Sequence, residues 1–323
     1  MRRAWLSRKH IPLLSTVVVC ALLYVVAAAL YRGFFSLQVF ANFFSDNSFL
    51  GIIAVGMTFV ILSGGIDLSV GSVMALCSIV AAVLMGKGGL HPVAAIAAAL
   101  ALGTALGLGQ GWVIRAFGLP PFIVTLAGMF FARGLGFIIH IEALPIDNPF
   151  YRAATDWAVE AGPARVPLTA LVFLAVVAVG IYVSVYTVFG RNVYAVGGSE
   201  ESARLMGIAV GRTKLLVYAL SGFCAALAGV VFTFYGSSGN PSAGVGMELD
   251  AIAAVVVGGT LLSGGVGTVF GTLMGVLIFG IIQTGIVFDG RLSSWWTRVA
   301  IGALLLLFIL LQKLFARPGL RGG

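Results

Sequence analysis

Residues 51–75 read GIIAVGMTFVILSGGIDLSVGSVMA, and a degenerate copy of this stretch follows 200 residues later. The offset that places residues 63–65 on residues 263–265 also pairs Ala54 with Ala254, Val55 with Val255, Leu62 with Leu262, Gly71 with Gly271 and Met74 with Met274. In both copies an apolar segment breaks at Ser-Gly-Gly and resumes as a glycine-containing helix. Interrupted hydrophobic segments in repeated positions are typical of transport pathways. The internal repeat around 51–75 and 251–275 therefore predicts a transporter.

The composition places the chain in a lipid bilayer. Hydrophobic residues make up 60% of the sequence and charged residues only 9%, with a mean hydropathy of +1.10. Soluble globular proteins carry roughly 25% charged residues. No polar block is long enough to fold alone, so we expect one transmembrane domain over residues 1–323, with an all-α, polytopic fold.

Several other classes of function are excluded. The net charge of +8 does not form a basic stripe with interleaved aromatic residues, which argues against a nucleic-acid partner. Cys20, Cys77 and Cys224 all lie in apolar runs and the three histidines are scattered, so neither a disulfide nor a metal site is expected. The apolar run at 11–30 has no cleavage signature after it, which predicts a retained first helix.

Ten apolar segments are candidates for membrane spans, since about 20 helical residues cross a hydrocarbon core about 30 Å thick. They lie at about 11–31, 43–62, 68–86, 92–114, 120–140, 167–188, 213–235, 249–262, 267–288 and 296–314. An even number places both termini on one side. With cytoplasmic termini, twelve lysines and arginines fall on the inner side and six on the outer side, as the positive-inside rule requires.

Two of these spans are short, and both end at Ser-Gly-Gly. The strongly apolar parts are residues 48–62 and 249–262. Either the helices begin earlier in more polar sequence, such as 42–47, or the breaks lie within the membrane beside protein or a water-filled cavity. In the second case the hinge glycines are Gly64, Gly65, Gly264 and Gly265.

Glycines at a spacing of four give two helices smooth faces that let neighbours approach closely. The two sets are Gly103-Gly107-Gly111 and Gly267-Gly271-Gly275. Each face either packs within this subunit or meets another permease subunit.

The longest predicted inner loop, residues 189–214, contains signals for a two-turn helix. Ser199 can cap its start, Glu200 and Glu201 suit the positive end of the helix dipole, Arg204 suits the other end, and Gly207 can end it. Met206, next to Gly207, is expected to protrude from this helix. The segment is either a stable loop or a docking surface for a cytoplasmic partner.

A few polar residues in apolar surroundings are candidates for a substrate pathway: Asn47, Asp67, Thr125, Arg133, Glu248 and Gln283. Asp67 is either the N-cap of the third span or a gate or ligand contact. Arg133 either pairs with Glu248 or Asp250, or contacts a polar ligand. Trp295 and Trp296 suit an interfacial aromatic belt, with stacking on a sugar as the alternative.

The sequence lacks the motifs of an ATPase or of a membrane enzyme. There is no G-x-x-x-x-G-K-[ST], H-E-x-x-H or G-x-S-x-G anywhere in the chain. We therefore expect no cofactor or metal in this chain and no catalytic residue. If transport is driven by ATP, ATP and Mg²⁺ bind to a partner polypeptide.

Residues 54–73, AVGMTFVILSGGIDLSVGSV, resemble the membrane permeases of bacterial sugar ABC importers of the ribose, xylose, galactose and autoinducer class. The likeness covers roughly residues 40–315 and continues through residues 126–134, 194–198, 206–208, 248–253 and 262–268. Residues 250–267 and 292–297 are most similar to one of the two permeases of the galactofuranose importer.

This resemblance implies a ten-helix subunit of the bacterial inner membrane, working with a second permease, either a homologue or a second copy. It also implies a cytoplasmic ATPase with two nucleotide sites and a periplasmic sugar-binding protein that holds most of the specificity. The segment 199–207 corresponds to the coupling helix of these permeases, which sits in a cleft of the ATPase. Ribose or galactose are the alternative sugars, and an ion-coupled secondary transporter is the alternative class.

Overall fold

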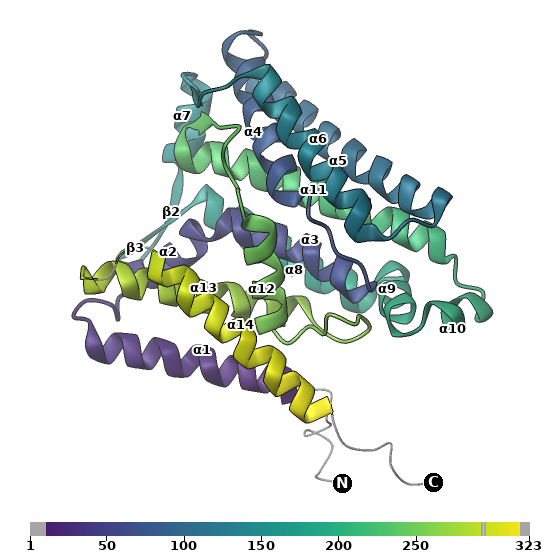
Figure 1. The fold of residues 1–323 in the computed structure, drawn as a ribbon. Coiled ribbons are helices and arrows are strands. Elements are labelled where there is room, and N and C mark those ends of the chain that lie inside the picture. The colour runs from purple at the N-terminus through teal and green to yellow at the C-terminus, as the bar shows by residue number, and fades with distance from the viewer. Residues whose placement is uncertain (1–10, 292, 294, 317–323) are drawn as a thin grey trace.

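Helices form most of the residues that the computed structural model describes, which are 11–291, 293 and 295–316 (Figure 1). They are α1 Ile11–Leu30, α2 Leu37–Asp46, α3 Ser48–Leu62, α4 Val70–Gly86, α5 Pro92–Phe117, α6 Pro121–Ile139, α7 Pro149–Asp156, α8 Leu168–Tyr186, α9 Val188–Gly198, α10 Glu200–Leu205, α11 Val210–Gly236, α12 Met247–Val257, α13 Val269–Asp289 and α14 Trp295–Ala316. The all-α prediction is confirmed, apart from short strands in the connections.

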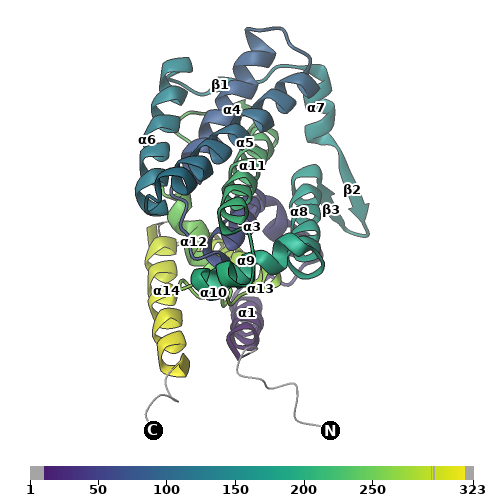
Figure 2. The same cartoon turned by 90° about the vertical axis from the view of Figure 1, so that its right-hand side faces the viewer.

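Four strands form two small antiparallel pairs. β1 Leu144–Pro145 pairs with β4 Ser238–Gly239, and β2 Ala158–Ala161 pairs with β3 Ala164–Pro167. The second pair is a hairpin that turns at Gly162, where φ is +61°. Together with α7, this hairpin forms most of the connection between α6 and α8 (Figure 2).

Each of the ten predicted spans contains a helix, but the number of crossings stays a prediction. Six of the described helices are long and apolar enough to cross a membrane, and the pair α2 and α3, bent by 58°, raises the number to seven. α4 is shorter, and the eleven residues of α12 extend only about 16 Å.

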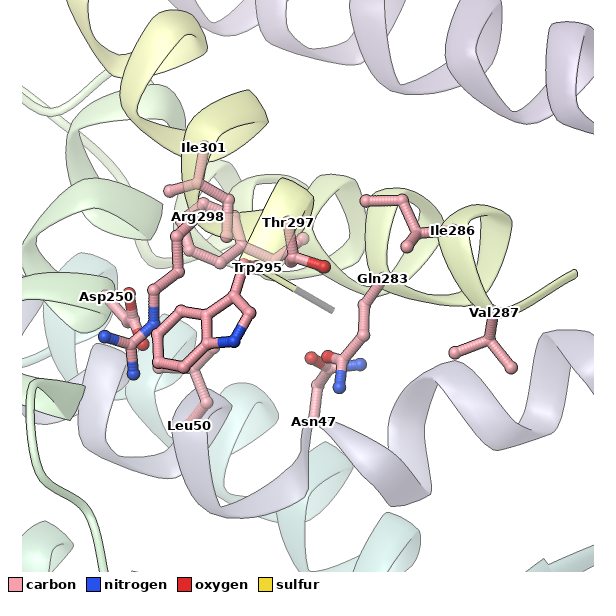
Figure 3. Close-up of a pocket in the computed structure, with 11 residues that line it drawn as sticks. Asn47, Leu50, Asp250, Gln283, Ile286, Val287, Trp295, Thr297, Arg298 and Ile301 are labelled. Carbon is pink, nitrogen blue, oxygen red and sulfur yellow. The ribbon is translucent and has the colours of Figure 1, made fainter. Parts of the chain in front are cut away.

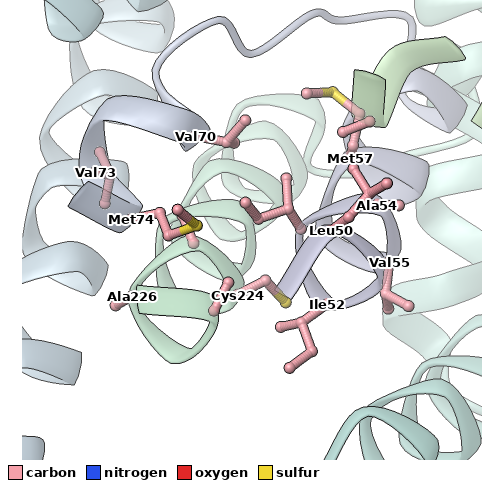
Figure 4. Packing of buried hydrophobic residues seen from close by; sticks show 14 of the residues in the cluster. Leu50, Ile52, Ala54, Val55, Met57, Val70, Val73, Met74, Cys224 and Ala226 are labelled. Carbon is pink, nitrogen blue, oxygen red and sulfur yellow. The ribbon is translucent and has the colours of Figure 1, made fainter. Parts of the chain in front are cut away.

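α3 is the centre of the core. Every residue of this helix except Phe49 is buried. The helix is apolar around its whole circumference, which suits a helix that neighbours enclose on all sides. Figure 4 shows Leu50 and Met57 of α3 in the same cluster as Cys224 and Ala226 of α11.

The face formed by Gly103, Gly107 and Gly111 packs against α11 of the same chain. A Cβ atom at Gly107 would lie 2.2 Å from the carbonyl oxygen of Tyr218, and one at Gly222 would lie 2.3 Å from that of Gly103. The two backbones touch directly, so of the two alternatives for this face, packing within the subunit is confirmed.

The second glycine face also packs internally, between α13 and α12. A Cβ atom at Gly271 would lie 2.1 Å from the carbonyl oxygen of Gly258, and one at Gly275 would lie 2.0 Å from that of Ala254. The second copy of the repeat is therefore a hairpin of two helices in backbone contact.

The first break is a helix end of the Schellman type. Gly64 has a φ of +81°, and its N–H donates to the carbonyl of Ile61 at 2.9 Å. The N–H of Gly65 donates to the carbonyl of Val60 at 3.0 Å. The Ser-Gly-Gly sequence ends α3 as predicted, because glycine adopts the left-handed conformation that this motif requires.

The second break begins earlier than predicted. The prediction that this apolar segment runs to Ser-Gly-Gly at 263–265 is wrong, because α12 ends at Val257. Gly259, with a φ of +91°, takes the role that Gly64 has in the first copy. Its N–H donates to the carbonyl of Val256 at 2.9 Å, and the N–H of Thr260 donates to that of Val255 at 3.2 Å. Residues 258–268 are consequently non-helical.

The close approach of α5 and α11 gives a direct test with a matched control. Gly107→Ala should lower the free energy of unfolding by about 1–3 kcal/mol, because the new methyl group meets backbone atoms that cannot rotate away. Gly109→Ala, on the same helix, has nothing within 4 Å of its added Cβ and should leave stability equal or slightly higher. Thermal unfolding of both purified variants in detergent measures the difference, and equal losses would contradict this packing.

Candidate functional site

α10 is a short helix that is capped at both ends. The hydroxyl of Ser199 accepts a hydrogen bond from the N–H of Ser202 at 3.2 Å, which caps the first turn. Glu200 forms salt bridges with Lys214 at 2.6 Å and Arg204 at 3.4 Å. The helix predicted from residues 199–207 is confirmed, and Lys214 of α11 anchors its start.

The other end of α10 is a second Schellman motif. Gly207 has a φ of +79° and donates to the carbonyl of Arg204 at 3.0 Å, while Ile208 donates to that of Ala203 at 3.0 Å. Ala203 is fully buried, but Leu205 is 84% exposed and Met206 is 68% exposed. α10 therefore packs against the bundle with one face, and Leu205 and Met206 at its C-terminal end point outward. In Figure 1, α10 lies at the right-hand side of the molecule, beside α9.

Six glycines join α10 to both breaks of the repeat. We call Gly64, Gly65, Gly197, Gly198, Gly264 and Gly265 the glycine junction. The N–H of Gly265 donates to the carbonyl of Leu62 at 3.0 Å, which ties the second break to the end of α3. Since residues 63–65 and 263–265 meet in space, the four predicted hinge glycines come together.

The last turn of α9 closes the glycine junction. A Cβ atom at Gly197 would lie 1.7 Å from the carbonyl oxygen of Leu62 and 2.6 Å from the nitrogen of Gly265. Tyr194, one turn earlier, donates its hydroxyl to the carbonyl of Gly267 at 2.9 Å. Ser199, the cap of α10, follows this turn directly. Gly197 and Gly198 were not among the predicted site residues, although a glycine doublet is a usable signal for close backbone contact.

A polar cluster holds the chain between the first break and α4. One carboxylate oxygen of Asp67 accepts from the N–H and hydroxyl of Ser69, at 2.9 and 2.7 Å, and the other accepts from the hydroxyl of Ser221 at 2.7 Å. The amide of Gln110 exchanges hydrogen bonds with Ser69. The prediction that Asp67 caps the next helix is wrong, because Ser69 is the N-cap of α4. Asp67 instead fastens the break to α11.

Thr125 belongs to the same cluster. Its hydroxyl lies 2.9 Å from the carbonyl of Pro121 on its own helix and 3.3 Å from that of Ile66 in the break. Tyr218 also reaches the Ile66 carbonyl, at 3.4 Å. Gln110, Tyr218 and Ser221 were not predicted, although lone polar residues in apolar helices are a usable signal.

Arg133 and Glu248 lie near each other without direct contact. Arg133 donates to the carbonyls of Pro241 and Ala243 at 2.7 and 2.6 Å, so it holds the connection between α11 and α12. Among the described residues it forms no salt bridge, and the direct pair predicted with Glu248 or Asp250 is absent. Glu248 attracts it only at longer range, and one Glu248 oxygen is buried without a hydrogen-bond partner in the described chain.

The remaining predicted residues, Asn47 and Gln283, line a pocket of about 360 Å³ (Figure 3). We call it the α13–α14 pocket. It lies among the start of α3, α12, α13 and the first turns of α14, and its other lining residues are Leu50, Asp250, Phe279, Ile286, Val287, Trp295, Thr297, Arg298 and Ile301. The six predicted pathway residues therefore divide among three places and do not form one site.

Comparison with known proteins gives one family. Residues 39–309 match the family described as branched-chain amino acid transport system / permease component. The chain is 51% identical to the inner membrane ABC transporter permease protein YjfF of Escherichia coli (strain K12), over 95% of this chain and 93% of that one. It is 38% identical to the ribose import permease protein RbsC of the same strain, over 96% and 95% of the two chains. It is 37% identical to the fructose import permease protein FruG of Bifidobacterium longum (strain NCC 2705), over 95% and 92%. No solved structure matches the chain.

The glycine junction predicts which of two adjacent glycines is required. Gly197→Ala should push α9 away from Leu62 and break the hydrogen bond from Gly265, whereas Gly198→Ala adds a methyl group with nothing within 4 Å. Hydrogen–deuterium exchange at the Gly265 amide should become roughly fivefold faster in the first variant, because a net hydrogen bond is worth about 1 kcal/mol. Unchanged exchange in Gly197→Ala, or equal acceleration in both variants, would contradict the junction.

Proposed function

The chain belongs to the branched-chain amino acid transport system / permease component family, and on that premise we propose that it is the permease subunit of an ATP-driven monosaccharide importer. It is a multi-pass protein of the inner membrane, like its relative YjfF. Relatives that import ribose and fructose by name support a sugar as the solute.

The proposal rests on the contacts that connect α10, through the last turn of α9, to both copies of the repeat. α10 exposes Leu205 and Met206, which suit insertion into an apolar cleft of a partner, and it follows directly from the last turn of α9. Through Gly197, that turn touches the end of α3 at Leu62 and the non-helical segment that follows α12 at Gly265. A force applied to α10 therefore reaches both copies of the repeat through a single turn of helix, the last turn of α9.

The partners follow from this arrangement. A cytoplasmic ATPase binds α10 and holds the ATP and Mg²⁺, since this chain has no P-loop. A periplasmic sugar-binding protein delivers the sugar, and a second permease, homologous or identical, completes the complex. In this proposal both termini and α10 lie on the cytoplasmic side.

The mechanism assigns a mechanical role to the breaks. Closure of the ATPase displaces α10 and the last turn of α9. The displaced turn moves the two breaks together, since Gly265 is bonded to Leu62. α3 and α13 follow as a pair, because the hydroxyls of Thr58 and Thr272 are hydrogen-bonded at 2.7 Å. The rearrangement opens the pathway inward for the sugar released by the binding protein.

For the sugar, galactofuranose is the first choice, on the likeness of residues 250–267 and 292–297 to a galactofuranose permease. Ribose and galactose are the alternatives. Reconstitution of the chain with its ATPase, binding protein and second permease, followed by uptake with each sugar as competitor, identifies the solute. Galactofuranose should compete most strongly. Uptake that needs no ATPase would identify a secondary transporter and overturn the proposal.

The exposed tip of α10 supplies a test of coupling. Leu205→Asp should reduce permease-stimulated ATP hydrolysis and uptake at least tenfold, because a charge replaces an apolar anchor, and truncated anchors cost about 2 kcal/mol or more. Leu205→Met keeps the apolar contact and should remain within about twofold of the native protein. Since Leu205 does not pack in the core, both variants should insert normally, and normal uptake by Leu205→Asp would count against coupling through α10.

A further inference from the structure

We infer that the α13–α14 pocket is a low-affinity binding site for one monosaccharide, a site on the transport pathway that accepts the sugar before it moves inward. This inference rests on the proposed function and adds a sugar site within the permease itself. The volume of about 360 Å³ lies at the lower end of the range of about 300–1,000 Å³ for small-molecule sites. A single sugar ring fits this space, and a long oligosaccharide does not.

The charges of the pocket favour a neutral ligand. Among the described residues that line it, Asp250 and Arg298 carry the charges, one of each sign. Figure 3 shows the Arg298 and Asp250 side chains on the same side of the pocket, where the positive charge of Arg298 stabilises the Asp250 carboxylate at longer range than a salt bridge. Because the two charges compensate, an anionic or cationic solute would find no unmatched partner, whereas hydroxyl groups can bond to either side chain.

The opposite side of the pocket offers amide groups with free hydrogen-bonding capacity. Asn47 is only 4% exposed, and its side-chain nitrogen donates to the carbonyl of Phe43 at 3.0 Å. Its oxygen has no hydrogen-bond donor among the described residues and can accept from a hydroxyl. The Gln283 amide makes no hydrogen bond within the described residues, and Figure 3 shows it next to Asn47. Paired amides of this kind act as donors and acceptors together, which matches the two roles of each sugar hydroxyl.

Trp295 supplies a flat surface between the two polar groups. The Arg298 guanidinium carbon lies 5.2 Å from the centre of the indole ring and covers one of its faces. Trp295 nevertheless remains 68% exposed. The negative face of an aromatic ring attracts the partly positive C–H groups along one side of a sugar ring. The pocket thus combines a stacking surface, two amides and a balanced charge pair.

The affinity should be low for a physical reason. Besides Trp295, five of the eleven lining residues are apolar, namely Leu50, Phe279, Ile286, Val287 and Ile301, and they offer a sugar no hydrogen bonds. A site on a pathway has to bind well enough to receive a solute and weakly enough to release it. We therefore expect dissociation constants in the millimolar range.

Tryptophan fluorescence of the purified full-length permease tests the inference without its partners. D-galactose, D-ribose and D-fructose are titrated to high millimolar concentration, with L-leucine as a non-sugar comparator. At least one sugar should give saturable quenching. Trp295→Phe should abolish this quenching, while Trp112→Phe, at another exposed tryptophan on α5, should keep it.

Two further variants separate binding from folding. Gln283→Leu removes hydrogen-bonding groups from an exposed position and should weaken binding about tenfold, with the melting temperature unchanged. Thr284→Val, at the next residue and outside the pocket lining, should bind like the native protein. Quenching by L-leucine and by no sugar, quenching that survives Trp295→Phe, or equal affinity in Gln283→Leu would each overturn the site.

Uptake by the reconstituted complex distinguishes the two proposals. In the complex, Gln283→Leu should reduce sugar uptake at low substrate concentration severalfold and leave ATP hydrolysis intact. If the native complex takes up sugar while the permease binds none of the three sugars, only the sugar site is overturned. If the native complex takes up no sugar, the proposed function itself fails.

Discussion

The backbone of the two broken segments has to find its hydrogen-bond partners inside the protein, because a bilayer core offers none. The structure meets this constraint by bringing the breaks together. The N–H of Gly265 bonds to the carbonyl of Leu62, and the last turn of α9 covers both through Gly197. No side chain fits between these three pieces of backbone, which is why glycines accumulate there. The position of α9, and hence of α10, is fixed by the same contacts that stabilise the breaks.

A contact made of backbone atoms transmits displacement differently from one made of side chains. Side chains absorb small shifts by changing rotamer, whereas the glycine junction has none to rearrange. In the proposed mechanism, movement of α10 therefore displaces the breaks directly. Beyond them, the bond between Thr58 and Thr272 and the Asp67 cluster connect the breaks to α13, α4 and α11. In the proposed mechanism, the two breaks therefore move these helices as units.

The sequence predicted those features whose causes are local. Ser199 and Gly207 close α10 through bonds to residues within the same helix, and the ten apolar segments each hold a helix. Features that depend on distant residues were missed or wrong. Asp67 is bonded by Ser221, 154 residues away, so its local position as a cap was misleading. The repeat predicted the second break at residues 263–265, but the chain leaves the helix at the first glycine doublet, Gly258-Gly259, and the Ser-Gly-Gly copy serves a tertiary contact instead.

Polar residues in apolar helices have two uses, and their own hydrogen bonds tell these apart. Asp67 and Thr125 were predicted beside Asn47 and Gln283 as contacts for a solute, and all four satisfy the same sequence criterion. In the fold, Asp67 and Thr125 bond to the first break, so their capacity is occupied by the chain itself. Asn47 keeps a free oxygen and Gln283 a free amide within the described residues, both facing one cavity. Since a group already bonded to the protein has little to gain from a solute, the polar residues that hold the breaks and those of the proposed sugar site are separate sets.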